Sequence, residues 1–163
     1  MDRGFTFNGM DDYIKQLRAL EDNVDDVATK ALEEAGKIMT DELREEVKKI
    51  PERQARNGSG KLRGLLKSDK DDILANLGTT PVKKGRNDEI NIKSGFYGGY
   101  GRRKTKKWVR GIPVQLTAAA INKGTAWLQS YPFVRKAIRK AQDQAESKIS
   151  EVFDHEIELK TKK

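Results

Sequence analysis

The feature of this sequence that most restricts its fold is a long helical stripe of apolar residues that ends at a proline. Between Val24 and Ile50, apolar side chains recur every three or four residues, the period of an amphipathic α-helix. Pro51 has no backbone N–H and cannot continue that helix. At 1.5 Å per residue the helix would be about 40 Å long. Such a stripe needs a partner surface along its whole length, and the alanines and Gly36 near it predict a close approach.

A second long stripe begins after Pro132, a residue type favoured in the first turn of a helix. Its apolar residues run from Phe133 to Ile157 at the same spacing. We expect a terminal helix over this range, followed by a solvated tail over residues 159–163. A shorter stripe over Met10–Leu20 predicts an additional N-terminal helix.

The residues between the long stripes change period. A small apolar cluster surrounds Ile73, and Gly78 is expected to end a short helix there. Glu89–Lys93 alternates polar and apolar residues, as a half-buried strand does, and Trp108–Ile112 is expected to be the returning strand. Another short helix is expected over Leu116–Ile121. The sequence therefore predicts an α+β domain over residues 1–163, with two long helices and the short N-terminal helix packed on a small antiparallel sheet.

Charge is distributed unevenly along the chain. Residues 1–51 carry 13 acidic and 8 basic residues, residues 52–112 carry 6 and 16, and residues 113–163 carry 6 and 9, which gives the net charge of +8. An acidic helical segment followed by a basic middle predicts contact with a polyanion or an acidic protein surface. The alternative is that the bases only keep a surface loop solvated.

The basic middle contains one concentrated segment. Five bases occur in six residues, namely Arg102, Arg103, Lys104, Lys106 and Lys107. The simplest prediction is a long hairpin loop, flexible over residues 98–107, whose bases face DNA or a protein partner. A helix or disorder over these bases is the alternative. Phe96, Tyr97, Tyr100 and Trp108 bracket these bases, an arrangement typical of phosphate contact combined with base stacking. Alternatively, these aromatic residues pack the sheet.

Nothing in the sequence predicts an enzyme or a cofactor. There is no cysteine, and the single histidine, His155, is flanked by acids near the chain's end. The phosphate-loop, dinucleotide and metalloprotease motifs are missing from the sequence. No apolar run approaches the roughly 20 residues of a membrane span, and the N-terminus lacks a signal peptide's apolar block. We therefore expect a noncatalytic, soluble intracellular protein without a metal or cofactor.

Two short segments carry a resemblance to a known family. Ser59-Gly60-Lys61-Leu62-Arg63, after the long acidic helix, resembles the pattern "aPv-x-tG-x-Lr". Gly124-Thr125 with Pro132-Phe133 resembles the pattern "xxGT…PFlrpA", which precedes a long terminal helix. In order and spacing the chain resembles the tail-completion, or head–tail joining, family of tailed double-stranded-DNA bacteriophages. It differs from that pattern at Lys123, where the family has an acid, and at Lys136, where it has a proline.

The resemblance implies a structural protein of the virion neck that completes the tail and joins it to the head connector, after assembly in the host cytoplasm. It implies a ring of copies, hexameric in the family, around the DNA channel, with the head connector and tail tube or terminator proteins as partners. A ring needs head-to-tail contacts, for which the sequence offers Glu42, Glu45 and Glu46 against a neighbour's basic middle. The matched residues Gly60, Leu62, Gly124, Thr125, Pro132 and Phe133 are expected to have structural roles.

Two other functions stay open from the sequence alone. One is a free cytoplasmic protein that binds nucleic acid without sequence preference, and the other is an assembly chaperone that does not remain in the particle. The first would shift a DNA fragment at low salt, whereas a neck component would be present in purified virions.

Overall fold

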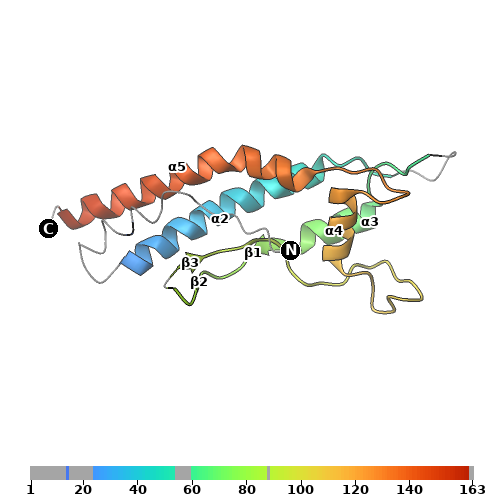
Figure 1. The fold of residues 1–163 in the computed structure, drawn as a ribbon, viewed down its shortest axis with the longest axis horizontal. Helices are drawn as coiled ribbons and strands as arrows, with labels where there is room; N and C mark the ends of the chain where they lie inside the picture. The colour runs from blue at the N-terminus through green and yellow to red at the C-terminus, as the bar shows by residue number, and fades with distance from the viewer. Residues whose placement is uncertain (1–13, 15–23, 54–59, 88, 162–163) are drawn as a thin grey trace. The chain divides into compact units, whose positions relative to one another are not determined.

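The structure of this protein is a computed structural model that describes residues 14, 24–53, 60–87 and 89–161. The described helices are α2 (Val24–Lys48), α3 (Lys67–Ala75), α4 (Val114–Lys123) and α5 (Phe133–Thr161). The described strands are β1 (Leu77–Thr79), β2 (Lys83–Lys84), β3 (Ile90–Asn91) and β4 (Ser94–Phe96) (Figure 1). The predicted α+β class, with two long helices and a small antiparallel β-structure, is confirmed. Apart from Ile14, the N-terminal helix expected over Met10–Leu20 lies outside the described residues.

The chain divides into two compact units. Unit 1 is built from residues 1–39, 79–94 and 141–163, and unit 2 from residues 40–78 and 95–140. The chain passes between the units at four places, two of which fall inside α2 and α5 and two inside β1 and β4, so each long helix contributes turns to both units. Whether the whole chain behaves as the single domain expected from the sequence stays a prediction.

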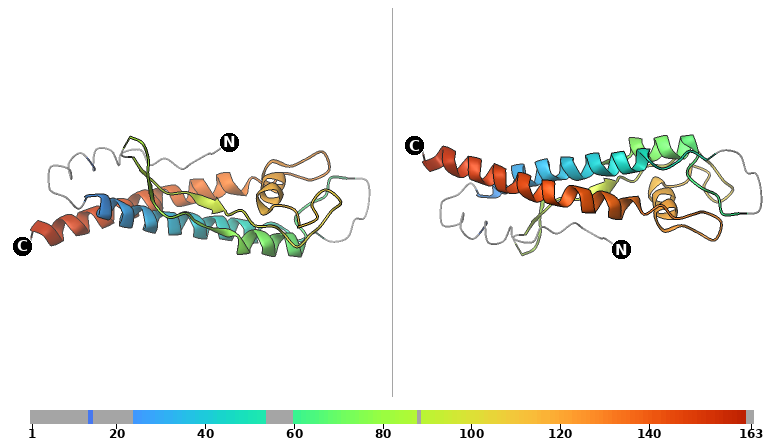
Figure 2. Two further views of the ribbon diagram at one scale, coloured as in Figure 1. Left: turned by 90° about the horizontal axis from the view of Figure 1, so that it is seen from below. Right: turned by 90° about the horizontal axis from the view of Figure 1, so that it is seen from above.

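The core of unit 1 is an alanine-rich contact between two helices. The first half of α2 and the second half of α5 lie side by side and antiparallel (Figure 2). Their buried residues form one cluster: Val27, Ala28, Ala31, Ala35, Ala145, Ile149 and Phe153. These are members of the two stripes seen in the sequence, and the small alanine side chains let the backbones approach closely. At the edge of this contact, Lys30 Nζ lies 3.0 Å from a carboxylate oxygen of Glu156.

The β-structure is a ribbon formed by one stretch of chain that turns back on itself. β1 pairs with β4, and β2 pairs with β3 in antiparallel register, with Lys83 opposite Asn91 and Lys84 opposite Ile90. Between the two pairs, the Thr80 N–H donates to the Lys93 carbonyl oxygen at 2.8 Å. Two residues lie between Thr80 and Lys83, but only Ile92 lies between Asn91 and Lys93. The extra residue of this bulge lies next to Pro81, which has no N–H to donate to a ladder.

Two details of the predicted sheet and its preceding helix are wrong. Trp108–Ile112 is not the strand that pairs with the one predicted over Glu89–Lys93. That predicted strand contains β3, and its partner is β2. Gly111 has a φ of +114°, which does not fit a regular strand, and an isolated bridge joins Tyr100 to Pro113 instead. The helix before the sheet ends at Ala75 with Asn76 as its C-cap, not at Gly78.

Gly78 has a different role in β1. A Cβ atom there would lie 2.6 Å from the ring carbon Cε2 of Tyr97, so the glycine makes room for that ring. The C-terminal end also differs from the tail expected over residues 159–163, since α5 continues to Thr161.

The core of unit 2 combines residues from all of its helices. Its buried apolar residues are Leu43, Val47, Ile50, Leu65, Ile73, Leu77, Val114, Ala118, Ile121, Phe133 and Ala137. Phe133 is 2% exposed and meets the ring of Phe96 edge to face, with the ring centroids 5.9 Å apart. The helix expected over Leu116–Ile121 is present as α4 and ends with Gly124 at a φ of +78°.

Gly36 is a glycine inside α2 where the β-ribbon contacts the helix backbone. A Cβ atom at this position would lie 2.8 Å from Thr79 Cγ2 and 3.0 Å from Ile92 Cδ1. The Gly36 carbonyl oxygen also accepts hydrogen bonds from the hydroxyls of Ser94, at 3.1 Å, and Thr79, at 3.4 Å. A glycine inside a helix costs about 1 kcal/mol relative to alanine, so the close contact with the ribbon explains its presence.

Replacing Gly36 by alanine should therefore destabilise the protein although alanine favours helix. The new methyl group overlaps Thr79, a β-branched residue with little freedom to move, and overpacking typically costs about 1–3 kcal/mol. After the gain in helix propensity we expect a net loss of up to about 2 kcal/mol in the free energy of unfolding, measured by urea denaturation. Gly98→Ala is the matched control, because nothing lies within 4 Å of a Cβ there. A G36A protein as stable as the parent would contradict this account of the contact.

Candidate functional site

The predicted basic loop is a narrow hairpin in unit 2, held by backbone hydrogen bonds. The Gly101 N–H donates to the Ile112 carbonyl oxygen at 2.8 Å, and the Ile112 N–H donates to the Arg103 carbonyl oxygen at 2.9 Å. Thr105 and Trp108 exchange backbone hydrogen bonds of 3.2 and 3.0 Å, which leaves Lys106 and Lys107 as the two turn residues. The Trp108 N–H also lies 3.1 Å from the Thr105 hydroxyl, an interaction that closes such turns.

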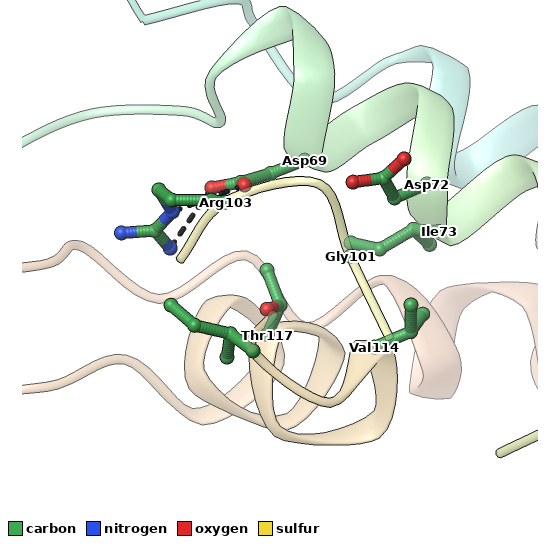
Figure 3. Close-up of a pocket in the computed structure, with 8 residues that line it drawn as sticks. Asp69, Asp72, Ile73, Gly101, Arg103, Val114 and Thr117 are labelled. Carbon is green, nitrogen blue, oxygen red and sulfur yellow. Dashed lines mark hydrogen bonds and ion pairs between the residues drawn. The ribbon is translucent and has the colours of Figure 1, made fainter. Parts of the chain in front are cut away.

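Two arginines attach the base of this loop to α3. Arg103 approaches Asp69 with two nitrogens, Nε at 3.1 Å and Nη2 at 3.0 Å, as Figure 3 shows. Arg102 binds Asp72 through its backbone N–H at 2.7 Å and through its side-chain Nε at 2.8 Å. We call these two pairs the clamp. The Asp69 side chain is only 7% exposed, so its charge depends on Arg103 for compensation.

The clamp changes the interpretation of the five bases in the loop. Arg102 and Arg103 do not extend freely toward a partner, because carboxylates of α3 already bind them. Lys104, Lys106 and Lys107 are exposed, and none of the ion pairs recorded among the described residues involves them. The Lys107 ammonium lies 5.6 Å from the centroid of the Trp108 ring. We call these three lysines the basic tip.

Arg110, which the sequence pattern did not indicate, is exposed beside the basic tip. The cationic stretch is also longer than the five bases of residues 102–107. No Asp or Glu occurs between Glu89 and Asp143, while the interval carries these bases: Lys93, Arg102, Arg103, Lys104, Lys106, Lys107, Arg110, Lys123, Arg135, Lys136, Arg139 and Lys140. A scan for acid-free intervals would have found it. The α3 acids that neutralise two of these bases are far away in the sequence, so no local pattern would have revealed them.

A recess lies behind the clamp in unit 2. Asp69, Asp72 and Ile73 of α3 line one side of it with Gly101 and Arg103, and Val114 and Thr117 lie below them (Figure 3). Ile112 completes the lining. The recess has no interior space large enough for a water molecule. The recess is therefore packing around the ion pairs.

The two segments that carry the family resemblance meet in unit 2. An isolated parallel bridge pairs Leu62 with Leu128. The Leu62 N–H donates to the Trp127 carbonyl oxygen at 2.7 Å, and the Gln129 N–H donates to the Leu62 carbonyl oxygen at 2.8 Å. Gly60 is exposed, with nothing within 4 Å of a Cβ there. Leu62 is thus the residue of the first segment that binds the second.

Within the second segment, the residues build the start of α5. Gly124 ends α4, and a Cβ there would lie 3.0 Å from the Ser130 backbone nitrogen. The Thr125 hydroxyl accepts the Leu128 N–H at 3.0 Å, which closes a turn like the one at Thr105. Pro132 directly precedes the helix, and the side-chain oxygen of Asn122 accepts the Val134 N–H at 3.2 Å. These contacts set the position at which Phe133 enters the core.

The three acids expected at a subunit interface have different environments. Glu45 is exposed and pairs with Lys48 on its own helix at 2.7 Å, while Glu42 is half-buried. Glu46 is 5% exposed and accepts hydrogen bonds from Lys140 and Lys49, so placing it at a subunit interface is wrong. The hydrogen bonds from Lys140 and then Lys49 lower the pKa of the Glu46 carboxyl. Its charge is used inside the fold, where it joins α2 to α5.

Other features bear on possible chemistry. His155 is exposed on α5. Within the described ranges, no three or more His, Cys, Asp or Glu side chains are grouped so as to hold a metal ion. No described helix combines the length and apolarity needed to cross a bilayer. No protein-family model, curated protein or solved structure matches this chain.

Removing one partner of the clamp should lower the free energy of unfolding more than removing the three charges of the basic tip. Arg103→Gln leaves the buried Asp69 carboxylate without its cation, and we expect a loss of about 2 kcal/mol in the free energy of unfolding. Asp69→Asn together with Arg103→Gln should recover part of that loss, since the uncompensated charge is gone. The control removes exposed charges only, as Lys104→Gln, Lys106→Gln and Lys107→Gln, and should leave stability nearly unchanged. Equal losses from Arg103 and the three lysines in urea denaturation would contradict the clamp.

The ion pairs of Glu46 should make stability depend on acid pH. Because the folded-state pKa is lowered, the charged carboxylate stabilises the fold above its unfolded pKa of about 4.3, and this stabilisation is lost as the pH falls through the folded pKa. Glu46→Gln should therefore flatten the fall in melting temperature between about pH 5 and pH 3. Glu45→Gln, which breaks a solvent-exposed pair on the same helix, is the matched control and should change this profile less. An unchanged profile in E46Q would show that the buried pair does not contribute.

Proposed function

We propose that this chain is a noncatalytic structural component of the neck of a tailed phage virion, where it completes the tail and joins it to the head connector. The observation that carries the proposal is the bridge between Leu62 and Leu128. The two segments that resemble the tail-completion family are more than sixty residues apart, yet they bind each other and fix the start of α5. If the resemblance reflects a common architecture, the two segments are expected to contact each other. Two chance matches are not.

In the proposed ring, copies of the chain contact one another head to tail around the DNA channel, between the head connector and the tail tube or terminator proteins. Of the three acids first considered for this contact, Glu45 is exposed and Glu42 half-buried, while Glu46 belongs to the core. The clamp supports the proposed role of the loop, because it holds the basic tip in one position without using its charges. A preordered cationic tip suits contact with passing DNA or with an acidic neighbour.

A second candidate function is a free protein that binds nucleic acid without sequence preference. The observation that favours it is the exposed basic tip beside the Trp108 ring. In that case the chain would bind DNA outside any particle, with an affinity that falls steeply as the salt concentration rises.

Mass spectrometry of purified particles, with copy number, distinguishes these functions. We expect the chain in every intact virion at a small, fixed number of copies. Its absence from particles that need it for assembly would favour an assembly chaperone. Absence together with a salt-sensitive shift of DNA fragments by the isolated protein would favour the free binder. Either result would overturn the neck proposal.

The role of the loop is tested in the same particles. Lys106→Gln with Lys107→Gln should lower the yield of infectious virions without lowering the stability of the protein, because both charges belong to the tip. Lys83→Gln with Arg86→Gln is the matched control, since it removes two exposed bases at the hairpin of unit 1. An equal effect of the two double variants would mean that the tip has no special function.

A further inference from the structure

Beside the Leu62–Leu128 bridge, an exposed aromatic ring and exposed cations come from neighbouring backbone segments. Leu62 and Leu128 are both half-buried, while their neighbours Lys61, Arg63, Trp127 and Gln129 are all exposed. The Leu62 N–H donates to the Trp127 carbonyl oxygen and the Gln129 N–H donates to the Leu62 carbonyl oxygen, which places residues 61–63 beside residues 127–129. Lys61 and Arg63 therefore belong to the segment that adjoins Trp127. We call these three residues the indole site.

The exposure of Trp127 is unusual for its residue type. Its relative exposure is 67%, whereas Trp108, the only other tryptophan of the chain, is half-buried under Lys107. Indole rings are highly buried on average, and an exposed ring loses the stabilisation that burial would give. The turn closed by Thr125 and the hydrogen bonds to Leu62 fix the backbone on both sides of it. The fold thus presents this ring to solvent on a rigid backbone.

The surroundings of the ring indicate which kind of ligand it suits. A protein-binding hot spot is an aromatic anchor in an apolar, desolvated centre from which lysine is depleted. The paired segments at Trp127 instead carry a lysine, an arginine and an amide, and the cationic stretch that contains it has no acid from residue 90 to residue 142. A planar ligand that carries negative charge matches these surroundings better than a protein surface does.

We propose that the indole site binds single-stranded nucleic acid, with a base stacked on Trp127 and the adjoining phosphates held by Lys61 and Arg63. Aromatic stacking combined with cations along the backbone is the general way in which proteins bind single strands without reading their sequence. A base within a duplex is stacked on its neighbours and does not offer its face, so the site should prefer single strands. This inference does not require the neck proposal to hold, although both start from the Leu62–Leu128 bridge.

The two tryptophans make a direct test possible. In a Trp108→Phe variant, Trp127 is the only fluorescent indole, and its emission reports its own contacts. We expect a thymidine oligonucleotide of about 12 nucleotides to quench this emission at low salt. Duplex DNA of the same length should quench it less. Heparin, which has charge but no bases, and polyglutamate, which imitates an acidic protein surface, should bind without quenching.

Variants separate the two parts of the site. In the otherwise unchanged protein, binding of the oligonucleotide is followed by anisotropy of a dye on the DNA. Trp127→Ala should weaken binding roughly tenfold, and Trp127→Phe should retain part of it, because phenylalanine still stacks. Lys61→Gln with Arg63→Gln should lower the slope of log affinity against log salt by about 1.4, the value for two lost phosphate contacts on a single strand. Lys83→Gln with Arg86→Gln is the control for net charge, and Lys106→Gln with Lys107→Gln separates this site from the basic tip.

Several results would overturn the proposal. They are the absence of quenching at any oligonucleotide concentration, equal quenching by heparin, and a response to polyglutamate alone, which would indicate an acidic protein partner. Equal weakening by the indole-site and control variants would also overturn it. Melting temperatures check that each variant is folded. If W108F does not fold, the W127F variant replaces it in the test. W127F keeps Trp108 as its only indole, so any quenching seen in the parent protein and lost in W127F comes from Trp127.

Discussion

The fold of unit 1 depends on how closely helix backbones and the β-ribbon can approach one another. Four of the seven residues buried between α2 and α5 are alanines, and Gly36 has no side chain where the ribbon contacts α2. The carbonyl oxygen of Gly36 then accepts hydrogen bonds from two ribbon hydroxyls, so the contact combines packing with polar attachment. Small residues therefore make much of the packing contact here, and an added atom would overlap a neighbouring group.

Unit 2 uses charge in two different ways. Some ions hold the structure together: Asp69 and Asp72 fix the loop through Arg102 and Arg103, and Glu46 joins α2 to α5 through Lys140. The charges of the basic tip and of the indole site are in none of the ion pairs recorded among the described residues, and we propose that they meet external ligands. The clamp fixes the loop that carries the basic tip. A preordered charged surface loses less entropy on binding than a flexible one.

Residue type alone did not separate these two uses. The five bases of residues 102–107 are equivalent in the sequence, yet the first two bind carboxylates thirty residues or more away. Glu46 looked like its neighbours Glu42 and Glu45, although it alone is buried. Trp127 lies between Ala126 and Leu128, with no pattern that marks it as exposed. In each case the deciding partner comes from a distant part of the chain.

The sequence by itself determined the elements whose information is local. Apolar spacing gave α2, α4 and α5 with their buried faces, Pro51 and Gly124 limited helices, and alternation located a strand near Ile90. These succeed because helix period, capping and proline chemistry act over a few residues. Only the tertiary structure decided the strand partners, the clamp, the burial of Glu46 and the pairing of Leu62 with Leu128. Those contacts join residues far apart in the chain, and the stability of each depends on the desolvation and geometry that the rest of the fold supplies.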